Sequence, residues 1–515
     1  RRDVVRPRPM TVELAILLAV AVPFAGAVLI PLTGAKPNLR ETVTLVCAAL
    51  LFYLVSVIYP TVAAGGVPEV YLFEMLPGLS VFFLVEPLGL IFAGIASFLW
   101  IATSVYSIGY MRGHNEENQT RFYAYFAIAL GAAMGVAFAG NMLTLFIFYE
   151  VLTLSTFPLV AHSGTDEAKR AGRVYLGVLL GTSIGFQLLA IIWTWSLTGT
   201  LDFTDGGILA GKADGLTAGI LLALYTFGIG KAALMPFHRW LPAAMVAPTP
   251  VSALLHAVAV VKAGVFTVVK VVVYIFGIDF LFDIGVSEWL QYMAAATILI
   301  ASLVAMTKDN LKARLAYSTV SQLSYVILGA MLVTDLGIIG SGMHIAMHAF
   351  GKITLFFCAG AFMVAAHKTE ISQMRGIGHA MPFTTLAFFI GSLSVIGLPP
   401  MGGLWSKWYL ALGTLETGKL WLLGVLMVSS LLNVAYLLPI PFRGFFSSPE
   451  ENPPLKSSHN HDSEHDHTHD QDRPKGIKEA PVACLIAIGV TSAGCLVLFF
   501  YPDPVYDLMR QIVTP

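Results

Sequence analysis

Long apolar runs recur from one end of this 515-residue chain to the other, and they constrain its fold more than any other feature. A helix that crosses a bilayer needs about 20 consecutive apolar residues, because its backbone polar groups find no water there. Only 12% of the residues are charged, against roughly 25% in an ordinary soluble domain. We therefore predict an all-α, polytopic membrane protein, which excludes a soluble enzyme, a nucleic-acid-binding protein and a disordered chain.

A hydropathy scan with a window of about 19 residues predicts fourteen transmembrane helices. Their approximate limits are 11–31, 39–60, 79–108, 121–139, 141–161, 173–197, 216–245, 251–277, 289–306, 316–334, 336–365, 383–412, 418–441 and 481–501. Lys and Arg are concentrated in the loops that follow the odd-numbered helices, and such loops usually face the cytoplasm. Both termini are therefore expected on the outer face of a bacterial cell membrane.

Two of the predicted helices are broken. In helix 7, Pro236 follows Lys231, and in helix 12 a Pro-Pro pair and a Gly-Gly pair precede Lys407. Proline removes a backbone donor and glycine lets the chain leave the helix, so carbonyls are freed within the membrane. Breaks at corresponding places are typical of inverted repeats. We predict two five-helix repeats of opposite topology, helices 4–8 within 121–277 and helices 9–13 within 289–441.

The rest of the chain divides into three N-terminal helices within 1–120, a polar linker at 444–478 and a last helix within 479–515. The linker has low complexity and no apolar periodicity, which predicts a solvated, disordered segment. A metal site is the alternative, because the linker contains five closely spaced histidines. These are His459, His461, His465, His467 and His469.

Cofactor motifs are missing from the sequence. The four cysteines lie inside apolar runs without any Cys-x-x-Cys pair, and neither a Walker loop nor a dinucleotide-binding glycine motif is present. They are Cys47, Cys358, Cys484 and Cys495. We expect no cofactor and no resident metal, so any redox or ATP chemistry would belong to other chains.

Charged residues inside the predicted helices are the strongest functional signal. Each costs about 2.5–3.5 kcal/mol at the membrane centre on insertion scales, so a chain that keeps several of them conducts, binds or couples something charged. They are Lys231, Lys262, Lys270, Lys352, Lys407 and Glu150, with Glu86 near the start of helix 3. For Lys270 the simpler interpretation is a side chain that reaches toward the interface, and for Glu86 an acid that suits a helix start.

Glu150 and Lys231 are candidates for a buried ion pair. Two unit charges about 4 Å apart interact by about 4 kcal/mol at an effective dielectric near 20. A static pair is one interpretation. The break beside Lys231 and the further titratable groups along the chain favour another, in which the pair opens and Lys231 passes a proton onward.

His344, His348 and Lys352 repeat at i, i+4 and i+8, which places them on one helical stripe about 12 Å long. Histidine titrates near neutral pH, so the stripe suits proton transfer. A single histidine here would more often be a hydrogen-bonded core residue, and a metal site lacks a carboxylate or cysteine neighbour. His256, six residues before Lys262, is a further candidate that organises water. Water inside the tenth helix could be lined by Tyr317, Ser318, Ser321 and Gln322, with ordinary helix packing as the alternative role for such serines.

Three segments resemble the proton-translocating antiporter-like subunits of respiratory complex I, membrane-bound hydrogenases and Mrp-type multisubunit antiporters. They read FYEVLTLSTFPLV around Glu150, GIGKAALMPFHRWLPAAMVAPTPVSALLHAVAVVKAGVF from before Lys231 to beyond Lys262, and MHIAMHAFGKITLFF from before His344 to beyond Lys352. The resemblance covers helices 3 to 13. It implies an inverted-repeat proton path whose central line is a Glu, a Lys, a second Lys and a terminal Lys or Glu. Those positions correspond here to Glu150, Lys231, Lys262 and Lys407.

Within this superfamily the chain looks most like the D-type subunit of an Mrp sodium/proton antiporter. The chain ends 14 residues after its last predicted helix, so we expect no long lateral helix. Lys407 at the end of the line resembles the Mrp form, although some complex I subunits also have a lysine there. The resemblance implies A-, B-, C-, E-, F- and G-type partner subunits, with protons and Na⁺ as the transported ions and no enzymatic activity of its own. A half-channel from the cytoplasm would enter near helices 7 and 8 and leave near helices 11 and 12.

Other functions remain open at this level. The main alternative is a proton-pumping subunit of complex I or of a membrane-bound hydrogenase, driven by electron transfer in other chains. A self-contained solute carrier would also contain broken helices, but it would need a polar substrate pocket where this chain has lysines. The Glu–Lys–Lys–Lys line argues against a non-conducting scaffold.

Overall fold

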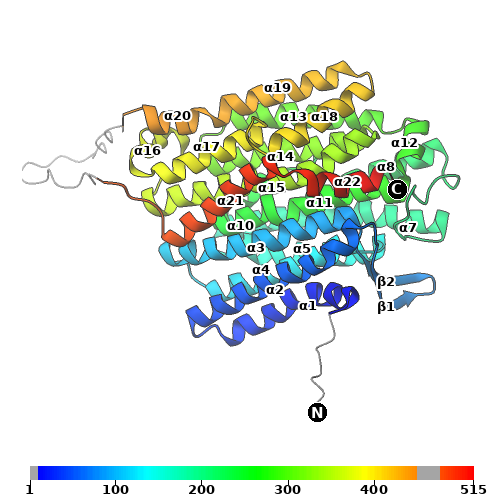
Figure 1. Cartoon of the computed structure of the whole chain (residues 1–515), viewed down its shortest axis with the longest axis horizontal. Helices are drawn as coiled ribbons and strands as arrows, with labels where there is room; N and C mark the ends of the chain where they lie inside the picture. Colours follow the sequence, from blue (N-terminus) through cyan, green and yellow to red (C-terminus); the bar gives the residue numbers. More distant parts are fainter. Residues whose placement is uncertain (1–9, 449–475, 515) are drawn as a thin grey trace, which may run out of the picture.

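The computed structural model describes residues 10–448 and 476–514, and in that part the chain is a bundle of helices that run side by side (Figure 1). Eleven of these helices are long and apolar enough to cross a membrane, and two shorter apolar helices, Gly215–Gly228 and Pro382–Ile396, accompany them. The predicted tenth helix corresponds to Leu311–Met331, which contains several buried serines and a glutamine and is therefore less apolar. The prediction of a helical, polytopic membrane protein is confirmed.

The N-terminal part holds a feature that the hydropathy scan missed. Helices α1 (Val12–Leu32) and α2 (Pro37–Ala63) are followed by an antiparallel hairpin of β1 (Glu69–Leu76) and β2 (Leu79–Leu84), and then by α3 (Pro87–Gly113). The third helix was predicted to begin at residue 79, where the structure has a strand. The LSVFFL segment is apolar enough for either structure, and its side chains alternate between buried and half-buried, as a strand requires.

The first predicted repeat consists of α4 to η5, and it is less regular than expected. Its elements are α4 (Gln119–Ala137), α5 (Met142–Val160), α6 (Asp166–Thr182), η1 (Ser183–Gln187), α7 (Leu188–Thr198), α8 (Gly215–Gly228), η2 (Gly230–Ala232), α9 (Trp240–Ala243), η3 (Ala244–Val246), α10 (Thr249–Ala253), η4 (Leu254–Val258), α11 (Val260–Lys270) and η5 (Val271–Phe276). The elements η1, η4 and η5 are π-helical turns, which frequently mark functional positions. The short helix α12 (Ile278–Ile284) leads to the second repeat.

The second predicted repeat and the C-terminal part complete the bundle. They contain α13 (Glu288–Thr307), α14 (Leu311–Met331), α15 (Asp335–Ala366), η6 (Ile371–Met374), α16 (Ile377–Ala380), α17 (Pro382–Ile396), α18 (Gly403–Glu416), α19 (Leu420–Leu437), α20 (Pro439–Phe446), α21 (Val482–Phe500) and α22 (Asp503–Val513). After the undescribed segment, α21 returns to the middle of the bundle and packs against α3, α15 and α17. The five linker histidines lie outside the described residues.

The helix ends form two opposite faces. The β1–β2 hairpin, the loop 199–214 and the C-terminal residues lie at one end, on the right in Figure 1, which we call the hairpin face. The residues that flank the undescribed segment lie at the other end, which we call the linker face. These names carry no assignment to either side of a membrane.

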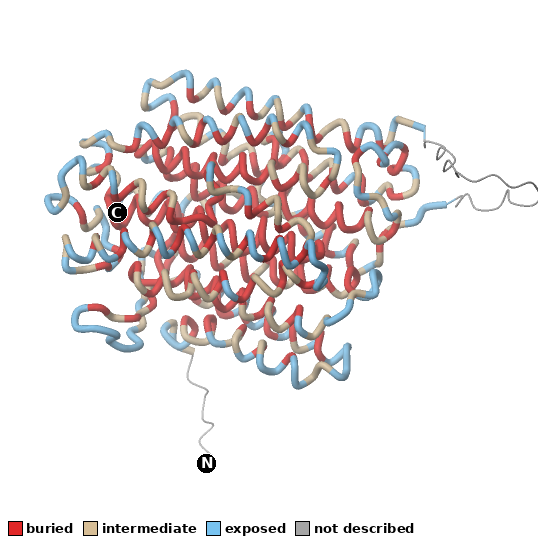
Figure 2. The backbone as a smooth tube through the Cα atoms, turned by 180° about the vertical axis from the view of Figure 1, so that it is seen from behind, coloured by how far each residue is buried: buried red, intermediate tan, exposed pale blue. Residues whose placement is uncertain are grey.

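Helix α15 lies at the centre of the bundle and is buried along most of its 32 residues. It contacts α3, α10, α11, α14, α17, α18 and α21, and Figure 2 shows how strongly buried residues concentrate in the interior. Three of the predicted site residues lie on this helix. Charged and polar side chains there are therefore shielded from lipid on every side by other helices.

The two predicted breaks are present, and they lie in helices of opposite direction. Helix α8 starts near the hairpin-face loop 199–214 and ends before Lys231, whereas α17 starts beside Glu479 at the linker face and ends before Lys407. At each break a glycine allows close backbone contact. A Cβ on Gly264 would lie 2.3 Å from the Lys231 carbonyl carbon, and one on Gly403 would contact the Ser394 carbonyl oxygen. The opposite directions support the proposed inverted repeats.

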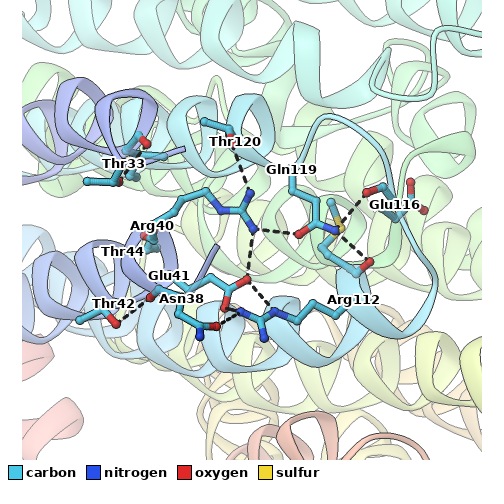
Figure 3. A network of polar contacts seen from close by, with 12 residues as sticks. Thr33, Asn38, Arg40, Glu41, Thr42, Thr44, Arg112, Glu116, Gln119 and Thr120 are labelled. Atoms are coloured by element: carbon cyan, nitrogen blue, oxygen red, sulfur yellow. Dashed lines mark hydrogen bonds and ion pairs between the residues drawn. The ribbon is translucent and has the colours of Figure 1, made fainter. Parts of the chain in front are cut away.

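A network of two arginines, a glutamate and neutral polar side chains joins α2, α3 and α4 at the linker face (Figure 3). The Arg40 guanidinium lies 3.1 Å from a Glu41 carboxylate oxygen, and Arg112 donates to both oxygens of the same carboxylate. Arg40 also donates to the side chains of Gln119 and Thr120. An arginine effectively never loses its proton, so this network is a static structural clamp.

Candidate functional site

The centre of the candidate site is a contact between α11 and α15. The amine of Lys262 lies 2.7 Å from Nδ1 of His348, and both side chains are buried. An amine and an imidazole at hydrogen-bonding distance can exchange one proton without crossing an apolar gap. This contact therefore joins the line predicted for the first repeat to the histidine stripe of the second.

From His348 the line continues along α15 toward α18. The rings of His348 and His344 stack with their centroids 5.7 Å apart. Nε2 of His344 lies 3.1 Å from the side-chain oxygen of Gln322, and its Nδ1 lies 2.8 Å from the hydroxyl of Ser406. Because an amide oxygen only accepts, Nε2 carries hydrogen and the Ser406 hydroxyl donates to Nδ1 when His344 is neutral.

Lys407 lies at the far end of this line. The ring of Tyr325 stacks on His344 with centroids 5.6 Å apart, and the Lys407 amine lies 4.8 Å from the centroid of the same ring. The amine donates to the Ile396 carbonyl at 2.9 Å and to the Ser430 hydroxyl at 3.3 Å. Since Ile396 is the last residue of α17, the break has freed a carbonyl that binds the lysine, as the sequence predicted.

Lys352 lies on a side branch of the line. Its amine donates to the Ser318 hydroxyl at 2.6 Å and to the Leu315 carbonyl at 3.3 Å, both on α14. Tyr436 donates to the same hydroxyl at 2.9 Å. We predicted Lys352 between the histidines and Lys407, whereas the contacts in the structure run from His344 through Ser406 and Tyr325 instead. The position of Lys352, two turns beyond His344 toward the linker face, suits a lateral supply of protons.

Lys231 and Glu150 do not form the expected ion pair. The Lys231 amine donates to the Thr153 hydroxyl and, at 3.0 Å, to the Tyr149 carbonyl, and it lies 3.2 Å from the centroid of the Tyr149 ring. Both Glu150 carboxylate oxygens are buried without a hydrogen-bond partner among the described residues. After the break at the end of α8 the amine reaches α5, the helix that carries Glu150, but it meets the Tyr149 carbonyl and ring and the Thr153 hydroxyl there instead of the carboxylate. The pair is open in this arrangement.

His256 lies in the π-helical turn η4 that precedes α11. The side chain is buried, its ring centroid lies 4.6 Å from that of Phe356, and neither ring nitrogen finds a partner within the part of the chain that the structure describes. A buried imidazole without partners usually bonds to internal water. This is compatible with the predicted water-organising role.

Lys270 is the clearest correction among the intramembrane charges. We expected it to reach toward an interface, but it is completely buried and its amine lies 3.2 Å from a carboxylate oxygen of Glu86. Glu86 does begin its helix as predicted, because its carboxylate accepts from the backbone N–H groups of Leu88 and Gly89. Tertiary packing of α3 on α11, which hydropathy does not report, brings the two charges together.

A polar cavity of about 270 Å³ opens at the linker face between the α3–α4 loop, residues 245–248 and the start of α14. Glu116 and Lys312 line it, and the Lys312 amine donates to the Ala247 carbonyl at 2.5 Å. Burial raises the pKa of Glu116, which lies in the loop outside the membrane-spanning helices. Ala359 of α15 forms part of the wall, so the cavity reaches the helix that carries the histidines.

Several side chains of the line were not identified from the sequence. Each bonds or stacks on a predicted residue, and two of them directly precede one in the chain. They are Tyr149, Thr153, Tyr325, Ser406, Ser430 and Tyr436. Serine and threonine are ordinary packing residues in membrane helices, so the sequence offered a signal only for Tyr149, next to Glu150, and for Ser406, next to Lys407.

Comparison with known proteins places the chain in one family. Residues 139–433 match the family described as NADH:quinone oxidoreductase/Mrp antiporter, TM. NADH-quinone oxidoreductase subunit N of Desulforudis audaxviator is 30% identical over 98% of this chain and 99% of its own length. The A/B-type component of a probable K⁺/H⁺ antiporter of Rhizobium meliloti is 30% identical over 85% of this chain, which spans only 44% of that protein.

Two solved structures share the fold along nearly the whole chain. A chain of the Mrp complex from Dietzia sp. DQ12-45-1b covers 98% of this protein and 97% of its own length, with a TM-score of 0.82 and 23% identity. A chain of a membrane-bound sulfane sulfur reductase, an archaeal respiratory membrane complex, gives a TM-score of 0.82 and 23% identity over 96% of each chain. With the full-length relative and the matched central segment, these findings show that the chain belongs to the transmembrane family shared by NADH:quinone oxidoreductases and Mrp antiporters.

Proposed function

We propose that this chain is the proton-conducting, D-type subunit of an Mrp-type monovalent cation/proton antiporter. The observation that carries this proposal is the series of contacts that joins the buried side chains of Lys262, His348 and His344 to the half-buried Lys407. A static core has no need of four titratable side chains in succession, since buried charges are costly. A proton path does need them, because each group must accept and then release a proton.

In the proposed path, protons enter from the linker-face cavity and reach the line near the irregular helix that contains His256 and Lys262. They leave the line at Lys407. The concentration of basic residues in the linker-side loops supports a cytoplasmic linker face and an outward hairpin face. Lys231 would pass its proton to the line near Lys262, since its backbone packs on Gly264, two residues beyond Lys262.

The A-, B-, C-, E-, F- and G-type subunits are the proposed partners. Support comes from the full-length likeness in fold to a chain of the Mrp complex and from a lysine at the end of the line. A redox-driven proton pump is the second candidate, favoured by the relative that matches over its whole length, which is part of an NADH-quinone oxidoreductase. In that case the same line of residues would be driven by electron transfer in other subunits.

A sodium pulse distinguishes the two functions. In everted vesicles that contain the assembled complex and a pH-sensitive dye, adding Na⁺ without any electron donor is expected to move protons. A sodium-driven signal follows from antiport, since the cation gradient is then the only energy source. Proton movement that needs an electron donor and ignores Na⁺ would reject the antiporter proposal in favour of the redox pump. Parallel pulses of K⁺ measure the cation preference.

Replacing His348 by Leu should slow Na⁺-driven proton movement by at least about 100-fold, the usual contribution of a positioned proton-transfer group. The variant roughly keeps the volume of the side chain but removes the ring nitrogen that contacts the Lys262 amine. The matched control is His367→Leu, at the linker-face end of α15 and outside the line, which should transport normally. Normal transport by His348→Leu would remove the α11–α15 contact from the path.

A further inference from the structure

A second buried ion pair lies near the hairpin face, and the line from Lys262 to Lys407 does not use it. The Lys270 amine lies 3.2 Å from one oxygen of Glu86 and donates to the Ala139 carbonyl at 2.9 Å. The Tyr274 hydroxyl donates to the other carboxylate oxygen at 3.2 Å. Both charged side chains are buried, with 0% and 4% of their areas exposed, so each depends on the other for its charge partner.

Glu86 also faces a cavity. A hollow of about 640 Å³ with both polar and apolar lining opens at the hairpin face between the α2–β1 loop, the loop 199–214 and the C-terminal residues. Glu86, Tyr274 and Asp205 line it, whereas Lys270 does not. The carboxylate therefore lies between the buried amine and a space that is large enough for several water molecules and offers them carboxylate and hydroxyl partners.

The positive charge of this pair belongs to a lysine, and the presence of lysine instead of arginine indicates that the proton can be released. At the linker face the same chain holds the buried carboxylate of Glu41 with two arginines, the buried Arg40 and the partly exposed Arg112 (Figure 3). A guanidinium holds a carboxylate as well as an ammonium does but effectively never releases its proton. Lys270 can release one, and it lies two turns along α11 from Lys262, about 12 Å by helical rise.

We propose that Lys270 and Glu86 form a second proton port, through which the first repeat exchanges protons with the hairpin face. In the transfer, an N–H bond of the Lys270 ammonium breaks and an O–H bond forms on the Glu86 carboxylate, which leaves a neutral amine and a carboxylic acid. The carboxylic acid then releases its proton to water in the cavity. The neutral amine of Lys270 accepts another proton, which arrives from the direction of Lys262. The other titratable groups that face the pair are Tyr274 and, across the cavity, Asp205. The port rests on the proton-conducting function proposed above.

The port is tested in a Lys407→Ala background, in which the main line is cut and a small proton flux remains. Adding Lys270→Arg keeps the ion pair but prevents proton release, so the remaining flux is expected to fall to that of empty vesicles. Glu86→Gln, which preserves the shape but cannot take a proton, should do the same. Adding Arg40→Lys, a conservative change in the static clamp, should leave the remaining flux unchanged. Assembly of each complex is checked by gel filtration.

Several outcomes overturn the port, and they differ from failure of the proposed function. Unchanged remaining flux in Lys270→Arg, or no flux above empty vesicles in Lys407→Ala alone, would leave the pair as a structural clamp. Wild-type proton movement in Lys407→Ala itself would instead reject the main line.

Thiol labelling gives a measurement that leaves the pair intact. All four native cysteines are buried, so Thr204→Cys places a reactive thiol at the cavity wall. In the Lys407→Ala background, a bulky membrane-impermeant reagent at this thiol should abolish the remaining flux. Ala210→Cys, exposed on the same loop outside the cavity, is the matched control and should not respond. Full flux after complete labelling at residue 204 would contradict the port.

Discussion

Replacing Lys231 by Ala or by Arg is expected to reduce Na⁺-driven proton movement by about 100-fold or more in an assembled complex. The alanine variant removes the amine that contacts Tyr149 and Thr153 on α5. The arginine variant keeps the positive charge but cannot release its proton. The measurement is the initial rate of dye response in everted vesicles. Lys212→Ala, which changes an exposed lysine of the hairpin-face loop, is the matched control and should behave as wild type.

Glu150→Gln tests how Lys231 is controlled. The structure shows the amine on Tyr149 and Thr153 and, among the described residues, the carboxylate without a partner, which is one state of a switch if the amine also visits Glu150. In that case Glu150→Gln should stop transport as completely as Lys231→Ala. Normal transport by Glu150→Gln beside an inactive Lys231→Arg would keep Lys231 in the path and eliminate the switch. Active Lys231→Arg would exclude proton release at this residue altogether.

Hydropathy and the Pro and Gly positions were enough to predict the membrane-spanning bundle and its two breaks. These features depend on local composition, which the sequence displays directly. The β1–β2 hairpin was missed because an apolar strand and an apolar helix end have the same hydropathy. The π-helical turns around His256 were missed for a similar reason, since nothing in the local sequence marks an extra residue in a turn.

The site was predictable as a set of residues but not as a set of contacts. Unusual charges in apolar helices identified Lys262 and Lys407, and helical spacing grouped His344 with His348. Which partner each one meets depends on how α14, α15 and α18 pack, and this placed Lys352 beside the line instead of within it. The same dependence separated the amine of Lys231 from Glu150 and joined Lys270 to Glu86. A charged residue inside an apolar helix can be recognised from the local sequence. The partner that it contacts is decided by tertiary packing.

Lys407→Ala is expected to lower proton movement at least tenfold, to about the small share assigned to the Lys270–Glu86 port. The line through His344 and Tyr325 would then end at an alanine, with no group to take the proton beyond the stacked rings. Lys407→Arg should be equally slow, because its guanidinium holds the proton permanently. The initial rates of the variants are compared in the same vesicles after a Na⁺ pulse.

Lys407→Glu separates proton transfer from simple charge at this position. A buried carboxylic acid can hold and release a proton, and in its protonated form it can donate to the Ile396 carbonyl that the break in α17 leaves free. This variant should therefore keep part of the activity that alanine and arginine lose, although its charge is opposite to that of lysine. Trp408→Phe, on the exposed side of the same helix, controls for local packing. If the Glu variant were as slow as the Ala variant while Arg remained active, Lys407 would serve as a fixed positive charge, and proton release at the end of the line would have to involve another group.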